Sequence, residues 1–336
     1  MRRLCLFGLI FMRDSYSRKI DYLRVSITDR CNLRCRYCMP EEGVSSVGHD
    51  SVLSYEELYR VVRIAVELGV RKIRLTGGEP LVRKGVVDFI GSLVQLPQKP
   101  ELTLTTNGML LADYAKDLKK AGLSRINISL DTLQPERFKQ ITRRDGLERV
   151  LNGLQAASDA GFSPLKINMV PISGVNADEI AAFGRLTYEH PWEVRFIEFM
   201  PVSSDLEYTA EQLYPATRIQ EDLRQIAELI PEARAGILGP ARIYRLKGAV
   251  GTVGVIHAVS EHFCRECNRL RLTSDGQLRP CLLADHEVDL RSVLRSGVDD
   301  RMVAEVLEKS VAEKPERHCL GKSYRPGQRK MQGIGG

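Results

Sequence analysis

Short segments in which hydrophobic and polar side chains alternate recur along the first two thirds of the chain. Longer segments whose hydrophobic residues have helical spacing lie between them. Strict alternation is typical of β-strands, and strands that alternate with helices are typical of a parallel sheet. The pattern therefore predicts six parallel strands, at Tyr22–Thr28, Lys72–Thr76, Leu102–Thr106, Arg125–Leu130, Leu165–Val170 and Glu193–Met200.

The clearest helix is predicted over Tyr55–Leu68. Ser54 stands at its N-cap with Glu57 three residues later, which is a capping box, and Gly69 ends it. Six strand–helix units are fewer than the eight that close a barrel. We therefore expect an α/β fold with an incomplete (βα)6 barrel.

The predicted strands have one aliphatic face and one polar or charged face. Barrel interiors are normally packed with branched aliphatic residues, and burying Arg and Lys there without partners is costly. We therefore expect the aliphatic faces to meet the outer helices and the polar faces to line an open interior that holds a large, charged ligand. An antiparallel sheet with one solvated face would alternate in the same way, but the intervening helices disfavour it. The polar positions include Arg24, Arg74, Thr105, Asn127, Ser129, Asp131, Lys166 and Asn168.

The pattern changes after about residue 220. A helix is predicted over Glu221–Leu229, and glycine-rich, hairpin-like segments follow Pro231. We interpret 1–20 as an N-terminal extension, 21–235 as the partial barrel and 236–336 as a C-terminal α+β domain.

The charge balance changes this picture little. The net charge of +6 comes from 49 basic and 43 acidic residues, which suits an anionic small molecule at least as well as nucleic acid. No apolar run approaches the roughly 20 residues of a membrane span. Residues 1–11 resemble a weak signal peptide without a cleavage site, so we interpret Met12 as the true start or residues 1–11 as a dispensable extension.

Six of the eight cysteines fall in two tight groups, which indicates metal binding in a reducing cytoplasm. Cys31, Cys35 and Cys38 form a C-x3-C-x2-C motif. Thiolates suit an iron–sulfur cluster, and three of them leave one iron of a cubane open for a non-protein ligand. The alternatives are a zinc knuckle or a disulfide pair, although zinc sites usually pair C-x2-C units and add a fourth ligand.

The second group is a C-x2-C-x13-C motif with a second cluster as its first interpretation. Zinc with a histidine as the fourth ligand is the alternative. The cysteines are Cys264, Cys267 and Cys281, and the candidate histidines are His262 and His286.

Three further motifs carry candidate chemistry. In Arg269-Leu270-Arg271, an extended backbone projects both guanidiniums to one side, where they suit phosphate oxygens. Gly77-Gly78-Glu79-Pro80 follows the second predicted strand, and its glycines let backbone approach a ligand closely. Gly335-Gly336 is narrow enough to enter a pocket, although a solvated tail is the default.

Together these motifs, with the segment Arg24–Asn32, resemble the GTP 3′,8-cyclase family of molybdenum cofactor biosynthesis, within the radical S-adenosylmethionine (SAM) superfamily. The resemblance runs from about residue 20 to the C-terminus. A peptide-modifying radical SAM enzyme is the nearest alternative, but these usually have more C-terminal cysteines. A zinc-stabilised nucleic-acid-binding module is the alternative from another class.

The resemblance implies a role for each matching residue. Cys31, Cys35 and Cys38 would ligate one 4Fe–4S cluster, and Cys264, Cys267 and Cys281 a second one in the C-terminal domain. The residues that would contact SAM are Tyr37, Gly78, Ser129 and Met200. The residues that would hold GTP are Arg24, Arg74, Thr105, Lys166, Arg269, Leu270 and Arg271. Arg24, Gly335 and Gly336 would act in catalysis.

The implied reaction abstracts the C3′ hydrogen of GTP by a radical derived from SAM and joins C3′ to guanine C8. The product would be (8S)-3′,8-cyclo-7,8-dihydroguanosine 5′-triphosphate. The implied cofactors are two 4Fe–4S clusters and SAM, and the implied partners are a reductant protein and, in the next step, cyclic pyranopterin monophosphate synthase. We expect a cytoplasmic monomer or homodimer without nucleic-acid or membrane partners.

Overall fold

One curved β-sheet organises the protein. The computed structural model describes residues 11–43, 48, 51–200, 202, 210–233, 239–318 and 329–335. Within these ranges twelve strands form one sheet in the order β14-β13-β12-β3-β4-β5-β6-β7-β8-β11-β10-β9, and β1 and β2 form a separate hairpin. The strands are β1 (Met12–Arg13), β2 (Lys19–Ile20), β3 (Tyr22–Ser26), β4 (Lys72–Thr76), β5 (Glu101–Thr106), β6 (Arg125–Ser129), β7 (Lys166–Met169), β8 (Glu193–Ile197), β9 (Leu229–Pro231), β10 (Arg242–Leu246), β11 (Thr252–Ile256), β12 (Arg269–Leu272), β13 (Gln277–Arg279) and β14 (Val288–Asp289).

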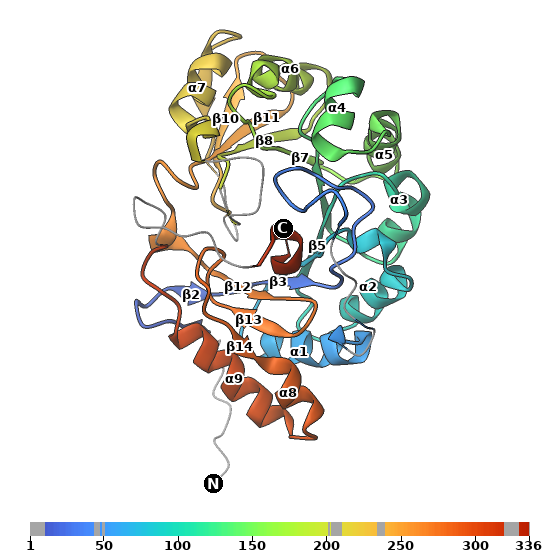
Figure 1. The fold of residues 1–336 in the computed structure, drawn as a ribbon, viewed down its shortest axis with the longest axis vertical. Helices are drawn as coiled ribbons and strands as arrows, with labels where there is room; N and C mark the ends of the chain where they lie inside the picture. Colours follow the sequence, from blue (N-terminus) through green and yellow to red (C-terminus); the bar gives the residue numbers. More distant parts are fainter. Residues whose placement is uncertain are drawn as a thin grey trace.

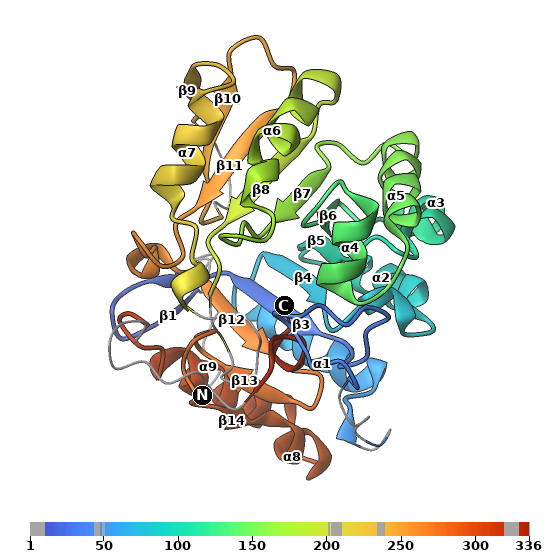
Figure 2. The same cartoon turned by 45° about the horizontal axis from the view of Figure 1, so that its top comes forward.

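The helices cover the outside of this arc, and the short C-terminal helix lies inside it (Figures 1 and 2). The α-helices are α1 (Tyr55–Glu67), α2 (Val86–Val94), α3 (Leu111–Lys120), α4 (Pro135–Thr142), α5 (Leu147–Asp159), α6 (Ile180–Glu189), α7 (Ala216–Arg224), α8 (Leu290–Arg295), α9 (Asp300–Ala312) and α10 (Met331–Ile334). No helix in these ranges is long and apolar enough to cross a membrane.

The six predicted parallel strands are present as β3 to β8, each within a few residues of its predicted bounds. Their predicted aliphatic faces are buried: Leu23, Ile73 and Ile128, for example, have no exposed surface. Because these side chains pack in one core with the outer helices, the polar faces point to the inside of the arc. The incomplete barrel is thereby confirmed.

The first helix begins where the sequence predicted. The Ser54 side chain accepts a hydrogen bond from the Glu57 backbone, and the Glu57 carboxylate accepts one from the Ser54 backbone N–H at 2.7 Å, which completes the capping box. The helix ends before Gly69, whose φ of 99° favours glycine. On the solvent side of α1, Arg60 pairs with Asp300 of α9 at 2.7 Å.

The residues after 220 extend both edges of the barrel sheet. β11 pairs in parallel with β8, and β12 pairs in parallel with β3. The predicted glycine-rich hairpin is the antiparallel pair β10–β11.

One predicted helix is misplaced. The helix expected over Glu221–Leu229 is α7, which starts after Pro215 and ends at Arg224. Leu229 instead starts β9 and pairs with Leu246. The apolar spacing of this segment also fits a helix, but pairing at the edge of the sheet decides its conformation.

Candidate active site

The first cysteine motif lies in the loop after β3 and is held by the C-terminal end of α4. The backbone N–H of Arg34 donates to Thr142 O at 2.9 Å, and that of Arg36 donates to Ile141 O at 3.0 Å. A turn brings Cys38 N to within 2.9 Å of Cys35 O. The three cysteines are therefore fixed on one short, well-anchored loop.

Burial sets the ionisation of these thiols. It raises the pKa of Cys31 to about 11 and that of Cys38 to about 12, and Cys31 adds to the rise at Cys38 because the two groups are close. Thiols with such high pKa values lose their protons readily only when a metal cation binds the sulfur. Three soft donors that repel one another as anions therefore fit iron.

Neither cysteine group has the compact geometry of a single metal ion's ligands: among the described residues no three His, Cys, Asp or Glu side chains are close enough for that. A cubane distributes its cysteines over different irons, so its ligands are spaced more widely.

The Gly77-Gly78-Glu79-Pro80 loop packs against the segment that leads into the first cysteine motif. A Cβ on Gly78 would lie 2.3 Å from Arg30 O, so only glycine fits there. The fully buried Glu79 carboxylate accepts hydrogen bonds from the backbone N–H of Asn107 and the hydroxyl of Thr106, both at 2.7 Å. Burial raises the pKa of Glu79 to about 7.

Tyr37, inside the first cysteine motif, is tied to the end of β6. Its hydroxyl donates to Asp131, whose other carboxylate oxygen accepts from Val170 N at 2.9 Å. Burial raises the pKa of Asp131 to about 6, although these two hydrogen bonds act to lower it. The cysteine loop is thus joined to the ends of two strands.

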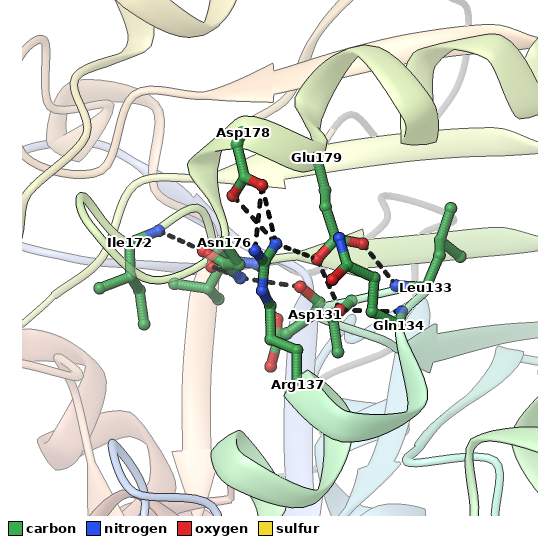
Figure 3. Close-up of polar contacts among 10 residues, drawn as sticks. Asp131, Leu133, Gln134, Arg137, Ile172, Asn176, Asp178 and Glu179 are labelled. Carbon is green, nitrogen blue, oxygen red and sulfur yellow. Dashed lines mark hydrogen bonds and ion pairs between the residues drawn. The ribbon is translucent and has the colours of Figure 1, made fainter.

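A polar network locks these strand ends together (Figure 3). The Asn176 side chain donates to Asp131 O at 2.8 Å and accepts from Ile172 N at 2.7 Å. Next to it, the buried Glu179 carboxylate accepts from Leu133 N at 2.7 Å and pairs with Arg137 of α4. Because α4 also holds the cysteine loop, the network orients Asp131 and the first cysteine motif relative to each other.

The main cavity lies inside the arc and is strongly basic. Two rows of side chains in register line it: Arg271, Arg24 and Arg74 in one row, and Arg269, Tyr22 and Lys72 in the other. Among the described residues that line the cavity, Asp131 is the acidic one; the basic ones are Arg24, Lys72, Arg74, Arg125, Lys166, Arg195, Arg269, Arg271 and Lys314.

These cations alter one another's ionisation. Burial and then Arg269 lower the pKa of Arg271 to about 10. Burial alone would raise the pKa of Tyr22, but Arg74, Arg24 and the neighbouring cations lower it to about 8. Lys166 shares the fully buried Glu193 with Arg195, at 3.0 Å from Lys166 Nζ. The cavity therefore suits a polyanion.

The second cysteine motif opens onto the same cavity. Cys264 begins the short 3-10 helix η5 (Cys264–Glu266), and all three cysteines line the cavity beside Arg269. Burial would raise the pKa of Cys267, but Lys314 and Arg269 lower it to about 7. Lys314 also donates to Arg269 O at 2.8 Å, so it joins the motif to β12.

Near the C-terminus, Met331 lines the cavity, and Gly335 contacts two arginines that also line it. Three side chains from three strands donate to the carbonyl of Gly335: Arg24 at 3.1 Å, Thr76 at 3.2 Å and Arg271 at 3.4 Å. Gly335 has a φ of 83°, and a Cβ there would lie 2.7 Å from the Thr76 hydroxyl. Gly336 lies outside the described residues.

Known proteins share both halves of the chain. A family model described as the radical SAM superfamily matches residues 25–187, and one described as Molybdenum Cofactor Synthesis C matches residues 192–320. The GTP 3′,8-cyclase of Pelotomaculum thermopropionicum is 48% identical over 326 residues, which cover 97% of this chain and 100% of that protein. That of Geobacter sulfurreducens is 49% identical over 307 residues, 91% of this chain and 94% of that protein.

The chain belongs to the GTP 3′,8-cyclase family. Its fold is also similar to the crystal structure of Streptococcus suis SuiB bound to S-adenosylmethionine, with a TM-score of 0.62 at 16% identity over 87% of this chain and 69% of that chain.

Apart from Gly335 and Gly336, the site residues predicted for this GTP 3′,8-cyclase family member fall into three groups. Most line the main cavity, namely Arg24, Tyr37, Arg74, Thr105, Ser129, Lys166, Met200, Arg269, Arg271 and the second cysteine motif. Gly78 and the three cysteines of the first motif do not line it, although Tyr37 within that motif does. Leu270 is 1% exposed and packs in the core, so only its backbone can face a ligand.

The histidines predicted as alternative zinc ligands have other contacts. His286 pairs with Glu313 at 2.6 Å, and the His262 ring packs against the His318 ring. Cys5 and Cys319 lie outside the described residues.

Sequence reasoning missed several cavity residues of this family member. Tyr22 and Lys72 stand two positions before Arg24 and Arg74, so strand alternation alone places them on the polar face. Arg195 follows from the same alternation in β8. Lys314 comes from the segment after α9, and no local pattern indicates its place in the cavity.

Proposed function

We propose that this protein is a GTP 3′,8-cyclase, a radical SAM lyase that converts GTP to (8S)-3′,8-cyclo-7,8-dihydroguanosine 5′-triphosphate in the first step of molybdenum cofactor biosynthesis. The observation that carries the proposal is the match to curated GTP 3′,8-cyclases over nearly the whole chain. The basic cavity lined by the second cysteine motif and by Tyr37 of the first motif supports it independently.

We assign two 4Fe–4S clusters. The first would be held by Cys31, Cys35 and Cys38, and the second by Cys264, Cys267 and Cys281. When bound, the first cluster with SAM supplies radical hydrogen abstraction after one-electron reduction. Tyr37, Gly78, Ser129 and Met200 would hold SAM at the end of the barrel where the first motif lies.

The basic rows of the cavity would hold GTP. Arg269 and Arg271 carry forked donors that match phosphate oxygens, and Arg24 and Arg74 extend the same surface across two further strands. Thr105, Lys166 and the Leu270 backbone complete the proposed contacts. Binding the triphosphate remotely fixes C3′ of the ribose relative to the first motif, which is how binding energy is turned into rate.

The chain's own catalytic task in this scheme is positioning. Arg24 would act with the Gly335-Gly336 tail, because Arg24 already donates to the Gly335 carbonyl. We further propose a cytoplasmic protein, monomeric or homodimeric, that takes electrons from a reductant protein and passes product to cyclic pyranopterin monophosphate synthase.

The test is product analysis under anaerobic conditions. The reconstituted protein is incubated with GTP, SAM and a chemical reductant, and the products are identified by mass spectrometry. We expect 5′-deoxyadenosine and the cyclised nucleotide to form together, with about eight irons per chain. The Cys267→Ser variant is the matched control: SAM cleavage should continue in part, without cyclised nucleotide. The proposal would be contradicted if the unaltered protein cleaved SAM at the same rate with and without GTP and formed no cyclised product.

A further inference from the structure

A buried arginine joins the N-terminal hairpin to the second cysteine motif. Arg18 lies in the turn before β2 and is 9% exposed, and its partner Asp14 is 6% exposed. No motif in the sequence marks either residue, and neither lines the main cavity.

The Arg18 guanidinium makes four polar contacts with three separate segments. Nε pairs with Asp14 Oδ2 at 2.5 Å, within the hairpin. Nη1 donates to Cys264 O at 2.7 Å and to Glu316 O at 2.8 Å, and Nη2 donates to Pro315 O at 2.6 Å. One planar group therefore fixes the backbone of the first cysteine in the motif and the segment that follows Lys314.

Asp14 makes the support for this guanidinium rigid. Its Oδ1 accepts from the backbone N–H groups of Tyr16 and Arg18, both at 2.9 Å, while Oδ2 faces the Arg18 Nε. Burying an ion pair is costly unless its remaining hydrogen-bonding groups are satisfied. Here the satisfying groups are the carbonyls of Cys264, Pro315 and Glu316, so both of these segments must keep their places for the pair to remain buried.

The same contacts bear on Lys314, which lies one residue before Pro315. Lys314 donates to Arg269 O and to Pro280 O, and Pro280 directly precedes Cys281. Arg18 thus holds Cys264 directly and acts on Cys281 through the 314–316 segment. Both ends of the cysteine motif are therefore held by one guanidinium, Cys264 through a direct hydrogen bond and Cys281 through the 314–316 segment.

We propose that Arg18 is a positioning residue for the second cysteine motif, setting the spacing of Cys264 and Cys281 for their cluster. The inference rests on the proposed function in one respect, that this motif holds a 4Fe–4S cluster. A lysine cannot replace the arginine, because one ammonium cannot reach a carboxylate and three carbonyls in a plane.

The experiment compares reconstituted full-length Arg18→Lys and Asp14→Asn proteins with the unaltered protein. Arg60→Lys is the matched control, because Arg60 also joins distant segments through Asp300 and a carbonyl, that of Val298, but contacts neither cysteine motif. The measurements are iron and sulfide per chain, the electron paramagnetic resonance spectrum of the reduced protein with and without GTP, and the thermal midpoint.

We expect Arg18→Lys to lower the iron from about eight to about four per chain, or to change the second cluster's signal and abolish its response to GTP. The first cluster's signal and reductive SAM cleavage should persist. Asp14→Asn keeps the guanidinium and should shift the second cluster's signal less. Arg60→Lys should leave both signals unchanged.

Two outcomes would overturn the inference. One is an Arg18→Lys protein with both clusters and an unaltered response to GTP. The other is loss of iron in Arg18→Lys and Arg60→Lys alike, in proportion to their thermal midpoints, since that pattern would indicate general destabilisation. If the unaltered protein itself binds only about four irons, the proposed second cluster fails before any variant is compared.

Discussion

Tyr22 reports the electrostatics of the cavity at the scale of one residue. It is 5% exposed and lies between Arg269 and Lys72 in its row. Because the surrounding cations lower its pKa to about 8, its ionised form is favoured in the folded protein. An ordinary tyrosine has a pKa near 10, so ionisation of Tyr22 should add stability as the pH rises from about 8 to about 10.

A pH titration of tyrosinate absorbance tests this. We expect one tyrosine to titrate near pH 8, and its signal to be absent from Tyr22→Phe. Saturating GTP should raise this pKa toward the ordinary value, because the triphosphate offsets the charge of the cations. A titration that GTP does not move would argue against phosphate binding in this row.

A second prediction at this scale concerns the first cysteine motif. Cys35 is buried, and burial followed by the charge of Cys38 raises its pKa well above the usual range. Cys35→Ser should lose the first cluster and all SAM cleavage, because a hard oxygen ligand holds such a cluster poorly. The iron content and 5′-deoxyadenosine yield are the measurements. Normal 5′-deoxyadenosine formation by this variant would refute the ligand assignment.

At the scale of elements, β12 places the arginines of a short sequence motif along one side of the cavity. Its alternation sends Arg269 and Arg271 to the inside and Leu270 to the core, and its pairing with β3 sets Arg271 beside Arg24. The projection of the two arginines to one side follows from strand geometry and was predictable. The strand's partner was not, because no local pattern encodes a pairing across such a sequence separation.

The Arg269→Ala/Arg271→Ala double variant should weaken GTP binding by at least about 100-fold, since two charge-assisted phosphate contacts are lost. Guanosine, which lacks phosphates, should lose far less. Calorimetric titration of both ligands gives the comparison. Arg242→Ala is the control, because Arg242 lies on β10 with its side chain 55% exposed in an ion pair. Equal losses for GTP and guanosine would rule out the phosphate role.

The helices show the same limit of sequence reasoning. The capping box of α1 is a local signal and fixed its start correctly. The segment after Pro215 has helical spacing that continues past Arg224, and the prediction placed the helix too late. There the competing interaction is a strand pairing with Leu246, which lies outside the window that spacing arguments use.

At the scale of the whole molecule, the first and last parts of the chain build one site. The carbonyl of Gly335 meets side chains of β3, β4 and β12. The sequence identified Gly335 and the arginines separately, but only the fold brings them together. Arg18 had no signal at all, because its partners outside the hairpin are backbone carbonyls nearly 250 residues or more away.

Deleting Gly335 and Gly336 should abolish cyclisation while leaving clusters and GTP binding nearly intact. Gly335→Ala should have much of the same effect, because a Cβ would meet Thr76 and Ser26 in addition to the unfavourable φ of 83°. Gly297→Ala is the matched control: its φ is 76°, and a Cβ there meets nothing within 4 Å. Full turnover by the deletion variant would remove the tail from the mechanism.

The parallel pairing of β12 with β3 has a consequence for how the protein is made. While the ribosome is still synthesising the central βα units, the outer backbone edge of β3 has no partner. An uncovered strand edge is a template for intermolecular pairing. The nascent chain therefore carries an aggregation-prone edge next to its first cysteine loop until Arg269–Leu272 has emerged, and chaperone supply during translation should limit the yield of folded enzyme.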